Sequence, residues 1–224
     1  MSIQTIIQVR EPVVKLLNAE TVSTFLAEAG SFASICYDSS SDPEKIALQC
    51  LRSGHFSGMR IVPLQFYIGD VSRAFSHQFV RHHVGIEINQ RSQRYVIEDI
   101  PKYILPDSLV DDVLFAAHMQ EVWRLYGRMI KKGIPAEDAR MILPNACATE
   151  FNVSMSIQAL INLCHERLCT RAQKEFRSVV VKMVDAVEAI EPRLSPLFVP
   201  KCMYRNGCPE LNCCGRVSNR ITFE

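Results

Sequence analysis

The sequence has no long apolar run and no excess of charge of either sign. No stretch is long enough to span a bilayer, and the N-terminal residues hold no apolar segment of the signal-peptide kind. Lys and Arg number 25 against 24 Asp and Glu, a formal net charge of +1. A protein without a broad basic field is poorly suited to bind nucleic acids or anionic membranes. We therefore expect a cytoplasmic protein that binds neither.

Glycine is also scarce, at 9 in 224 residues, and no Gly-x-Gly-x-x-Gly pattern occurs. Its absence argues against a Rossmann dinucleotide-binding domain, whose phosphate turn needs those glycines. The chain is 48% hydrophobic and 22% charged, which is ordinary for a globular protein. Its length suits one large domain with an appendage. We expect a single α+β domain over residues 1–200 and a Cys-rich tail over 201–224.

Apolar spacing alternates in some segments and has a helical period in others, which predicts an α+β fold with an antiparallel sheet packed against long helices. Strands are expected at residues 2–10, 60–68 and 146–153. Helices are expected at 21–34, 43–52, 70–83, 107–132, 135–140, from Ser154 or Ser156 to about 167, and at 177–190. On helix 70–83, Asp70 is the expected N-cap, and Gln78, Arg81 and His82 fall at i, i+3 and i+4 on one face.

The stretch from Arg81 to Tyr95 is rich in arginine, histidine and amide side chains. From Arg73 to Arg94 there are four arginines against one glutamate, a formal charge of +3. Arginine offers a fixed fork of donors that matches phosphate oxygens and the edge of a nucleobase. A local anion site on a neutral protein favours a small phosphorylated ligand. The alternative is a solvated loop with ordinary surface salt bridges, which for Arg91 alone is the preferred interpretation.

This stretch resembles the signature of the flavin-dependent thymidylate synthase family, which has Arg-His-Arg, seven residues and then Ser within Asn-x-x-Ser-x-Arg-Tyr. Residues 89–95 read Asn-Gln-Arg-Ser-Gln-Arg-Tyr and fit the second half fully. In the first half His83 replaces the last arginine, and eight residues separate it from Ser92. One inserted residue near Gly85 accounts for that spacing, because glycine tolerates the backbone geometry of a bulge.

Other segments resemble the same family over about residues 33–177. Gly54-His55-x-Ser57 is similar to its Gly-His turn, and residues 139–144 to its Ala-Arg-x-x-Leu-Pro segment, with Arg140 as the phosphate-binding arginine. The helix that contains Asn162 and Arg167 is similar to its second signature helix. The sequence departs from the family pattern at Arg60, Gln158 and Arg171. Without the resemblance, Arg140 could simply pair with Glu137.

The resemblance implies the conversion of dUMP to dTMP, with methylenetetrahydrofolate as carbon donor, FAD as cofactor and NADPH as reductant. It also implies a homotetramer with active sites shared between chains. Arg167 would be catalytic by stabilising negative charge on the uracil ring. The residues implied for dUMP are Gln78, Arg81, Gln90, Arg91, Ser92, Gln93, Arg94, Arg140 and Arg167. Those implied for FAD are Ser57, Arg81, His82, His83, Asn89, Gln90 and Asn162, with His55 stacking on the folate or nicotinamide.

Two alternatives of other classes remain open on the sequence alone. One is a nucleic-acid-binding module, with the cysteine tail as a metal knuckle, against which the neutral charge balance argues. The other is a catalytically idle family member that serves as a scaffold. No segment around the nine cysteines resembles an activated thiolate nucleophile, which favours flavin chemistry over a cysteine nucleophile.

The tail contains four cysteines within thirteen residues, at positions 202, 208, 213 and 214. In a chain without an export signal such thiols are more typical of metal ligands than of disulfides. Zinc ligands are usually separated by two to four residues, a spacing that Cys208 and Cys213 match. A zinc site of Cys202, Cys208 and Cys213 with one further donor is therefore a prediction, and a tail of free thiols is the alternative.

Overall fold

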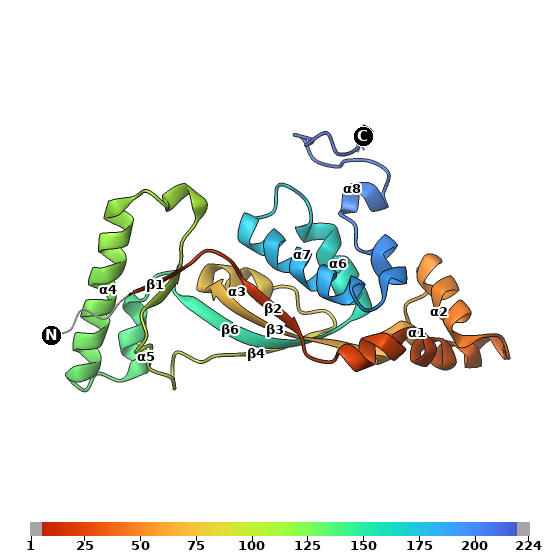
Figure 1. The fold of residues 1–224 in the computed structure, drawn as a ribbon, viewed down its shortest axis with the longest axis horizontal. Coiled ribbons are helices and arrows are strands. Elements are labelled where there is room, and N and C mark those ends of the chain that lie inside the picture. Colours follow the sequence, from red (N-terminus) through yellow and green to blue (C-terminus); the bar gives the residue numbers. More distant parts are fainter. Residues whose placement is uncertain (1–5, 219–224) are drawn as a thin grey trace. The chain divides into compact units, whose positions relative to one another are not determined.

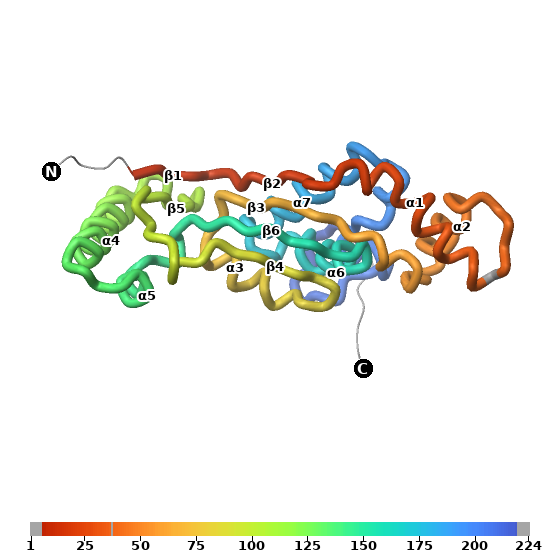
Figure 2. Tube along the Cα trace, turned by 90° about the horizontal axis from the view of Figure 1, so that it is seen from below, coloured from red at the N-terminus to blue at the C-terminus, as the bar shows by residue number. Residues whose placement is uncertain are grey.

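The computed structural model describes residues 6–218 and has an α+β fold with an antiparallel sheet and many helices, as predicted. Four strands form a sheet in the order β2-β3-β6-β4, and they run side by side in Figure 2. Their bounds are Val13–Leu16 for β2, Pro63–Ser72 for β3, Ile86–Gln90 for β4 and Ala148–Ser156 for β6. A second, parallel pair consists of β1 (Ile7–Val9) and β5 (Lys102–Ile104), with Gln8 opposite Tyr103.

Eight α-helices are assigned within residues 6–218. They are α1 (Ala19–Ser34), α2 (Pro43–Arg52), α3 (Arg73–Phe79), α4 (Val113–Lys131), α5 (Ala136–Ala139), α6 (Ile157–Arg167), α7 (Lys174–Glu188) and α8 (Lys201–Tyr204). Short 3-10 turns include η2 (Gly58–Ile61), η3 (Asp107–Leu109), η4 (Arg140–Ile142) and η5 (Pro192–Leu197). No helix in this part of the chain is both long and apolar enough to cross a membrane.

The chain divides into two compact units, each assembled from separate segments. Unit 1 contains the described part of residues 1–13 together with 68–81 and 89–152. Unit 2 contains 14–67, 82–88 and the described part of 153–224. Each strand of the four-stranded sheet contributes residues to both units.

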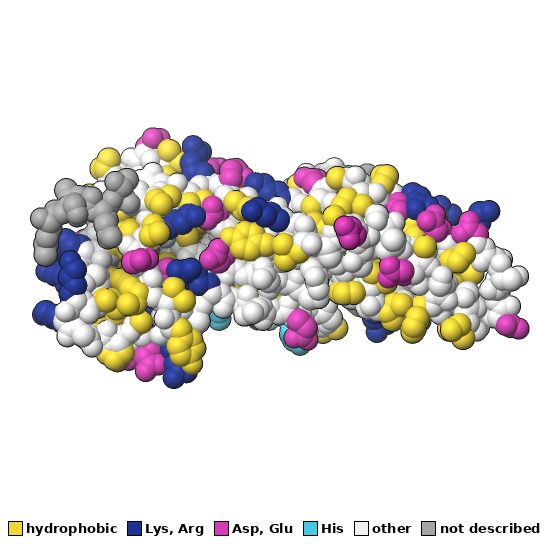
Figure 3. Space-filling view, turned by 60° about the horizontal axis from the view of Figure 1, so that its bottom comes forward, with side chains coloured by type: hydrophobic (Ala, Val, Ile, Leu, Met, Phe, Trp, Pro, Cys, Tyr) yellow, Lys and Arg dark blue, Asp and Glu magenta, His cyan; other side chains and the backbone are white. Residues whose placement is uncertain are grey.

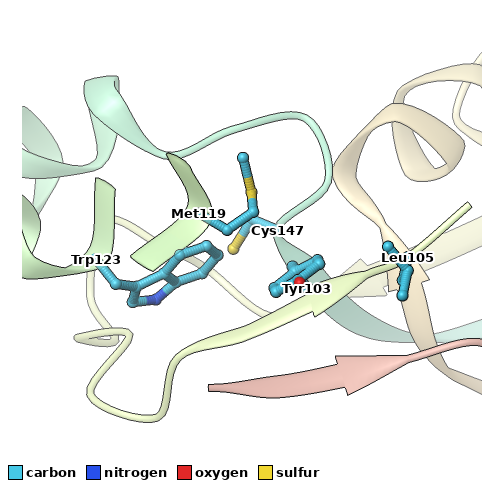
Figure 4. Close-up of a cluster of buried hydrophobic side chains, with 5 residues drawn as sticks. All are labelled: Tyr103, Leu105, Met119, Trp123 and Cys147. Atoms are coloured by element: carbon cyan, nitrogen blue, oxygen red, sulfur yellow. The ribbon is translucent and has the colours of Figure 1, made fainter. Parts of the chain in front are cut away.

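Unit 1 is built around a cluster of large side chains (Figure 4). Tyr103 of β5 and the pair Met119 and Trp123, four residues apart on one face of α4, pack with Cys147 just before β6. The rings of Tyr103 and Trp123 lie 6.5 Å apart. The cluster fixes the start of β6 against α4, and the loop after β4 joins it through Gln93.

Unit 2 contains two helix pairs, which are seen in Figure 1 as α1 with α2 and α6 with α7. Asp42 caps α2 by accepting a hydrogen bond from the Glu44 amide at 3.0 Å, as the Asp-Pro signal predicts. Gly30 of α1 allows close approach, because a Cβ there would lie 1.7 Å from the Pro43 carbonyl oxygen. Ser156 caps α6 by accepting from the Ala159 amide, so the second of the two expected caps is confirmed.

Strands β3 and β6 alternate between buried and less buried side chains, as predicted. On β3 the inward side chains are Leu64, Phe66 and Ile68, and on β6 they include Phe151 and Val153. The prediction that the first of these strands starts at residue 60 is wrong, because residues 58–61 form the turn η2. Cys147, expected on the inward side, is buried just before β6 begins.

The helix expected over residues 70–83 is wrong at both ends. Strand β3 continues to Ser72, whose hydroxyl accepts from the Phe75 amide at 2.9 Å and caps α3. Asp70 lies inside the strand with φ of +56° and forms an ion pair with Lys102 instead of capping the helix. Helix α3 ends at Phe79, so Arg81 and His82 do not occupy the helical positions that would place them on one face with Gln78.

The long helix expected over residues 107–132 begins later than predicted. A 3-10 turn occupies Asp107–Leu109, and Asp112 caps α4 by accepting from the amides of Leu114 and Phe115. The expected end is confirmed, because α4 stops at Lys131 and Gly133 has φ of +80°.

Candidate active site

Two of the arginines implied for dUMP, of which Arg140 is the one expected at the phosphate, converge on one residue of unit 1. Arg94, in the loop after β4, donates from Nε to the Glu137 carboxylate at 2.7 Å. Arg140, the first residue of η4, donates from Nε to the backbone carbonyl of the same Glu137 at 3.1 Å. The pairing of Arg140 with Glu137 that the sequence left open therefore exists, but through the main chain. Glu137 brings together two cations that are 46 positions apart.

The remaining side chains of the signature loop contact unit 1 in several ways. Gln90 donates to the Thr149 hydroxyl at 3.2 Å, and the Ser92 hydroxyl accepts from the Arg94 amide at 3.3 Å. Gln93 is 7% exposed and donates to the Cys147 sulfur at 3.3 Å. Its amide therefore anchors the loop to the core cluster.

Arg91 has the structural contacts that the alternative interpretation proposes for it. Its guanidinium lies 3.4 Å from Glu150 and 3.7 Å from Glu98. Burial raises the pKa of Glu98, although the charges of Arg91 and Arg73 lower it. These side chains line a cavity of about 240 Å³ in unit 1, together with the ion pair of Asp70 and Lys102.

Two other residues implied for dUMP, Gln78 and Arg81, also belong to unit 1. Gln78 is half-buried on α3, and Arg81 is exposed just beyond that helix. All residues implied for dUMP except Arg167 thus belong to unit 1.

Arg167 forms a compact group with His82 and Phe176 in unit 2. It is the last residue of α6, and its Nε donates to Nε2 of His82 at 3.0 Å. Its guanidinium carbon lies 4.4 Å from the ring centroid of Phe176, which is fully buried on α7. His82 meets the same ring edge-on, with centroids 5.6 Å apart and planes at 82°. The histidine expected at the flavin thus contacts the arginine expected at the uracil.

The other residues implied for FAD present polar groups to solvent. Ser57, His83 and Asn162 in unit 2 are exposed, as is His55 after α2. Asn89 is exposed on β4 and belongs to unit 1. A flavin ring carries carbonyl and nitrogen acceptors, so exposed amide, hydroxyl and imidazole donors of this kind fit it chemically.

A second cavity of about 240 Å³ lies at the C-terminal end of α6 in unit 2. Arg167 lines it, together with the loop that follows α6 and with the tail. Lys201 pairs with Glu166, and Arg171 lies 3.2 Å from Glu210. Ion pairs therefore link the tail to α6, which carries Arg167, and to the loop that follows α6.

All nine cysteines are free thiols. Burial raises the pKa of Cys147 and that of Cys164 to about 12, so neither supplies a thiolate at neutral pH. In the tail Cys202 and Cys208 are buried and Cys213 is half-buried. Within residues 6–218 no group of three or more His, Cys, Asp or Glu side chains is placed to hold a metal ion. The zinc site stays a prediction.

Sequence reasoning missed Phe176 and gave Glu137 only the role of a surface partner. Phe176 carries no polar atom, and in the sequence it has only the apolar spacing of a core residue. Glu137 was visible as a neighbour of Arg140 at i, i−3, but its contact with Arg94 is long-range. Neither role has a local signal that could have revealed it.

On the face shown in Figure 3, basic and acidic side chains are interspersed. This distribution agrees with the nearly balanced composition of 25 Lys and Arg against 24 Asp and Glu.

The family model and the relatives found by comparison with known proteins all carry the name thymidylate synthase. A family model described as thymidylate synthase complementing protein matches residues 20–193. The flavin-dependent thymidylate synthase of Geobacter sulfurreducens is 35% identical over 179 residues, which are 77% of this chain and 76% of that protein. The enzyme of the same name from Clostridium tetani is 33% identical over 177 residues, 70% of each chain. That from Sulfurisphaera tokodaii is 36% identical over 155 residues, 67% of this chain and 60% of that one.

A solved structure supports the fold. A UMP/dUMP methylase from Streptomyces cacaoi, bound with 5-Br dUMP, superposes with a TM-score of 0.68 at 18% identity. The match covers 86% of this chain and 98% of that one. At that identity the likeness bears on the fold alone.

Proposed function

This chain belongs to the flavin-dependent thymidylate synthase family, and we propose from that premise that it converts dUMP to dTMP. The carbon donor in this proposal is methylenetetrahydrofolate, and bound FAD, once reduced, supplies the hydride. The observation that carries the proposal is the family match over residues 20–193, which contain the signature loop and Arg167. The contacts of Arg94 and Arg140 with Glu137, and of Arg167 with His82 and Phe176, support it with geometry.

In this proposal the chain's residues bind the nucleotide and stabilise charge. C5 of a uracil ring becomes nucleophilic when negative charge is built on the ring and held there. The guanidinium of Arg167 holds that charge, which is an electrostatic role in catalysis. Arg94 and Arg140 bind the base and phosphate; contacts of their Nε atoms with Glu137 orient both side chains, and arginine is a charged donor suited to phosphate. No thiolate is needed, in keeping with the raised pKa of Cys147 and of Cys164.

The exposed donors of unit 2 would hold the flavin. His83 and Asn162 would donate hydrogen bonds to its ring acceptors, and Ser57 would add a hydroxyl. His55, exposed in the turn after α2, would stack on the folate or the nicotinamide. Asn89 and Gln90 would contribute amide donors from β4.

Finer features of the proposal follow the family. NADPH would be the reductant, and the protein would be a cytoplasmic homotetramer whose active sites combine several chains. The catalytic domain would comprise residues 1–200, with the tail from 201 as an appendage.

Turnover and spectroscopy test the proposal together. Purified protein should show the absorbance bands of oxidised flavin after incubation with FAD, and adding dUMP should perturb them. With methylenetetrahydrofolate and NADPH, it should convert dUMP to dTMP. Protein that binds dUMP but takes up no flavin and forms no dTMP would instead be an idle family member. A colourless protein with steeply salt-dependent oligonucleotide binding would favour the nucleic-acid alternative.

A zinc ion held by Cys202, Cys208 and Cys213 is a separate part of the proposal. Elemental analysis of protein purified without chelator or affinity metal should find about one zinc per chain if three tail thiolates and one further donor bind it. Well under one zinc, with every tail thiol open to titration, rejects the site.

A further inference from the structure

The proposed function gives no role to the contact between Arg167 and the fully buried ring of Phe176. Phe176 lies on α7, two residues after that helix begins, and its ring faces the guanidinium of Arg167 at 4.4 Å. The two helices pack side by side in unit 2 (Figure 1). The ring is 0% exposed, so its neighbours on every side restrict its position.

Two contacts restrict the guanidinium, and a third holds its histidine partner. The face of Phe176 holds the guanidinium carbon over the ring at 4.4 Å from its centroid, because a cation is attracted to the negative face of the ring. The hydrogen bond from Nε to Nε2 of His82 at 3.0 Å restricts its rotation. His82 is held in turn by its edge-on contact with Phe176. The acceptor nitrogen of His82 must be unprotonated for this bond to form.

Arginine is a long side chain with large rotamer entropy, and a catalytic charge loses effect when it must be ordered during the reaction. We propose that Phe176 is a positioning residue for Arg167, and that its ring face orients the guanidinium toward the uracil before the charge develops. This inference rests on the proposed function. Phe176 itself need not touch substrate or cofactor, since it acts through Arg167.

Two substitutions at Phe176 distinguish the effect of the aromatic face from the effect of side-chain volume. Phe176→Leu keeps an apolar side chain in the core but removes the π face, and should lower kcat by about 3- to 30-fold. Phe176→Tyr keeps the face and should retain kcat within about threefold, even where its buried hydroxyl lowers Tm. If the leucine variant does not fold, Phe176→Met replaces it under the same criteria, because methionine fills irregular core space.

The matched control is Phe25→Leu. Phe25 is also 0% exposed, lies on α1 of the same unit, and has no cation over its ring among the described contacts. This variant should lose stability as Phe176→Leu does, with kcat per folded, flavin-loaded protein unchanged within about twofold.

A double-mutant cycle with Arg167→Ala decides whether Phe176 acts through Arg167. In that background Phe176→Leu should cause no further loss of kcat. A merely structural role predicts that the full factor appears again, and that result overturns the inference. A kcat of Phe176→Leu within twofold of wild type also overturns it. Equal kcat values for Phe176→Leu and Phe176→Tyr do the same. The proposed function fails separately, if the wild-type protein forms no dTMP at all.

Discussion

Replacing Arg140 and replacing Arg167 by alanine should affect different kinetic parameters, because the proposed function gives the two residues different roles. Arg140 is half-buried in unit 1, with its Nε tied to the Glu137 carbonyl, and Glu137 also holds Arg94. A residue that only grips phosphate contributes equally to binding substrate and transition state. Arg140→Ala should therefore raise the KM for dUMP and leave kcat nearly unchanged.

Arg167→Ala should lower kcat, because in the proposed mechanism Arg167 stabilises a charge that develops only during the reaction. Losing one charge-assisted contact costs about 1.5–3 kcal/mol. That range corresponds to about 10- to 150-fold, in KM for Arg140 and in kcat for Arg167. Stacking on Phe176 and the bond to His82 place the loss for Arg167 toward the upper part of this range.

The assay is steady-state formation of dTMP with dUMP as the varied substrate, with rates normalised to bound flavin. Arg124→Ala is the matched control, since Arg124 is an exposed arginine on α4 whose visible contact is an ion pair with Glu121. It should change neither parameter by more than about twofold, because exposed pairs contribute little. If Arg140→Ala lowers kcat while Arg167→Ala only raises KM, the assignment of the two roles is wrong.

Three further changes test the local structure. Asp112→Ala should lower the free energy of unfolding by about 1 kcal/mol, measured by denaturant titration, because it removes the cap of α4; no loss would show that the cap is dispensable. Gly85→Ala should lower the free energy of unfolding by about 1–2 kcal/mol, because Gly85 has φ of +71° and a Cβ there would lie 3.0 Å from the Ser156 hydroxyl that caps α6. An unchanged Tm would contradict this. As pH rises, Cys214 should be alkylated before the other thiols, because a hydrogen bond with the Thr170 side chain lowers its pKa and its thiolate therefore forms at lower pH. Thr170→Val should shift the pH profile upward, and faster labelling of the exposed Cys36 would refute the assignment.

Features that depend on a few neighbouring residues were predictable from the sequence. Asp42 before Pro43 marked the start of α2, Ser156 was one of two candidate caps for α6, and Gly133 marked the end of α4, because caps and left-handed turns are satisfied within one helical turn. The alternation of β6 likewise needed only its own residues. The start of α3 was predicted wrongly at Asp70, because tertiary contacts keep β3 extended to Ser72.

In the candidate site, too, the sequence identified some features and only the tertiary structure decided others. The motif around Asn89–Tyr95, with Arg140 and Arg167, identified the residue types and the family from sequence alone. Only the tertiary structure decided that Arg94 meets Glu137, 43 positions away, and that Arg167 meets His82, 85 positions away. Contacts at such separations depend on how whole strands and helices pack, and no local propensity encodes them. For the same reason Phe176 has only a core spacing in the sequence, and its contact with a guanidinium emerges only when α6 and α7 pack together.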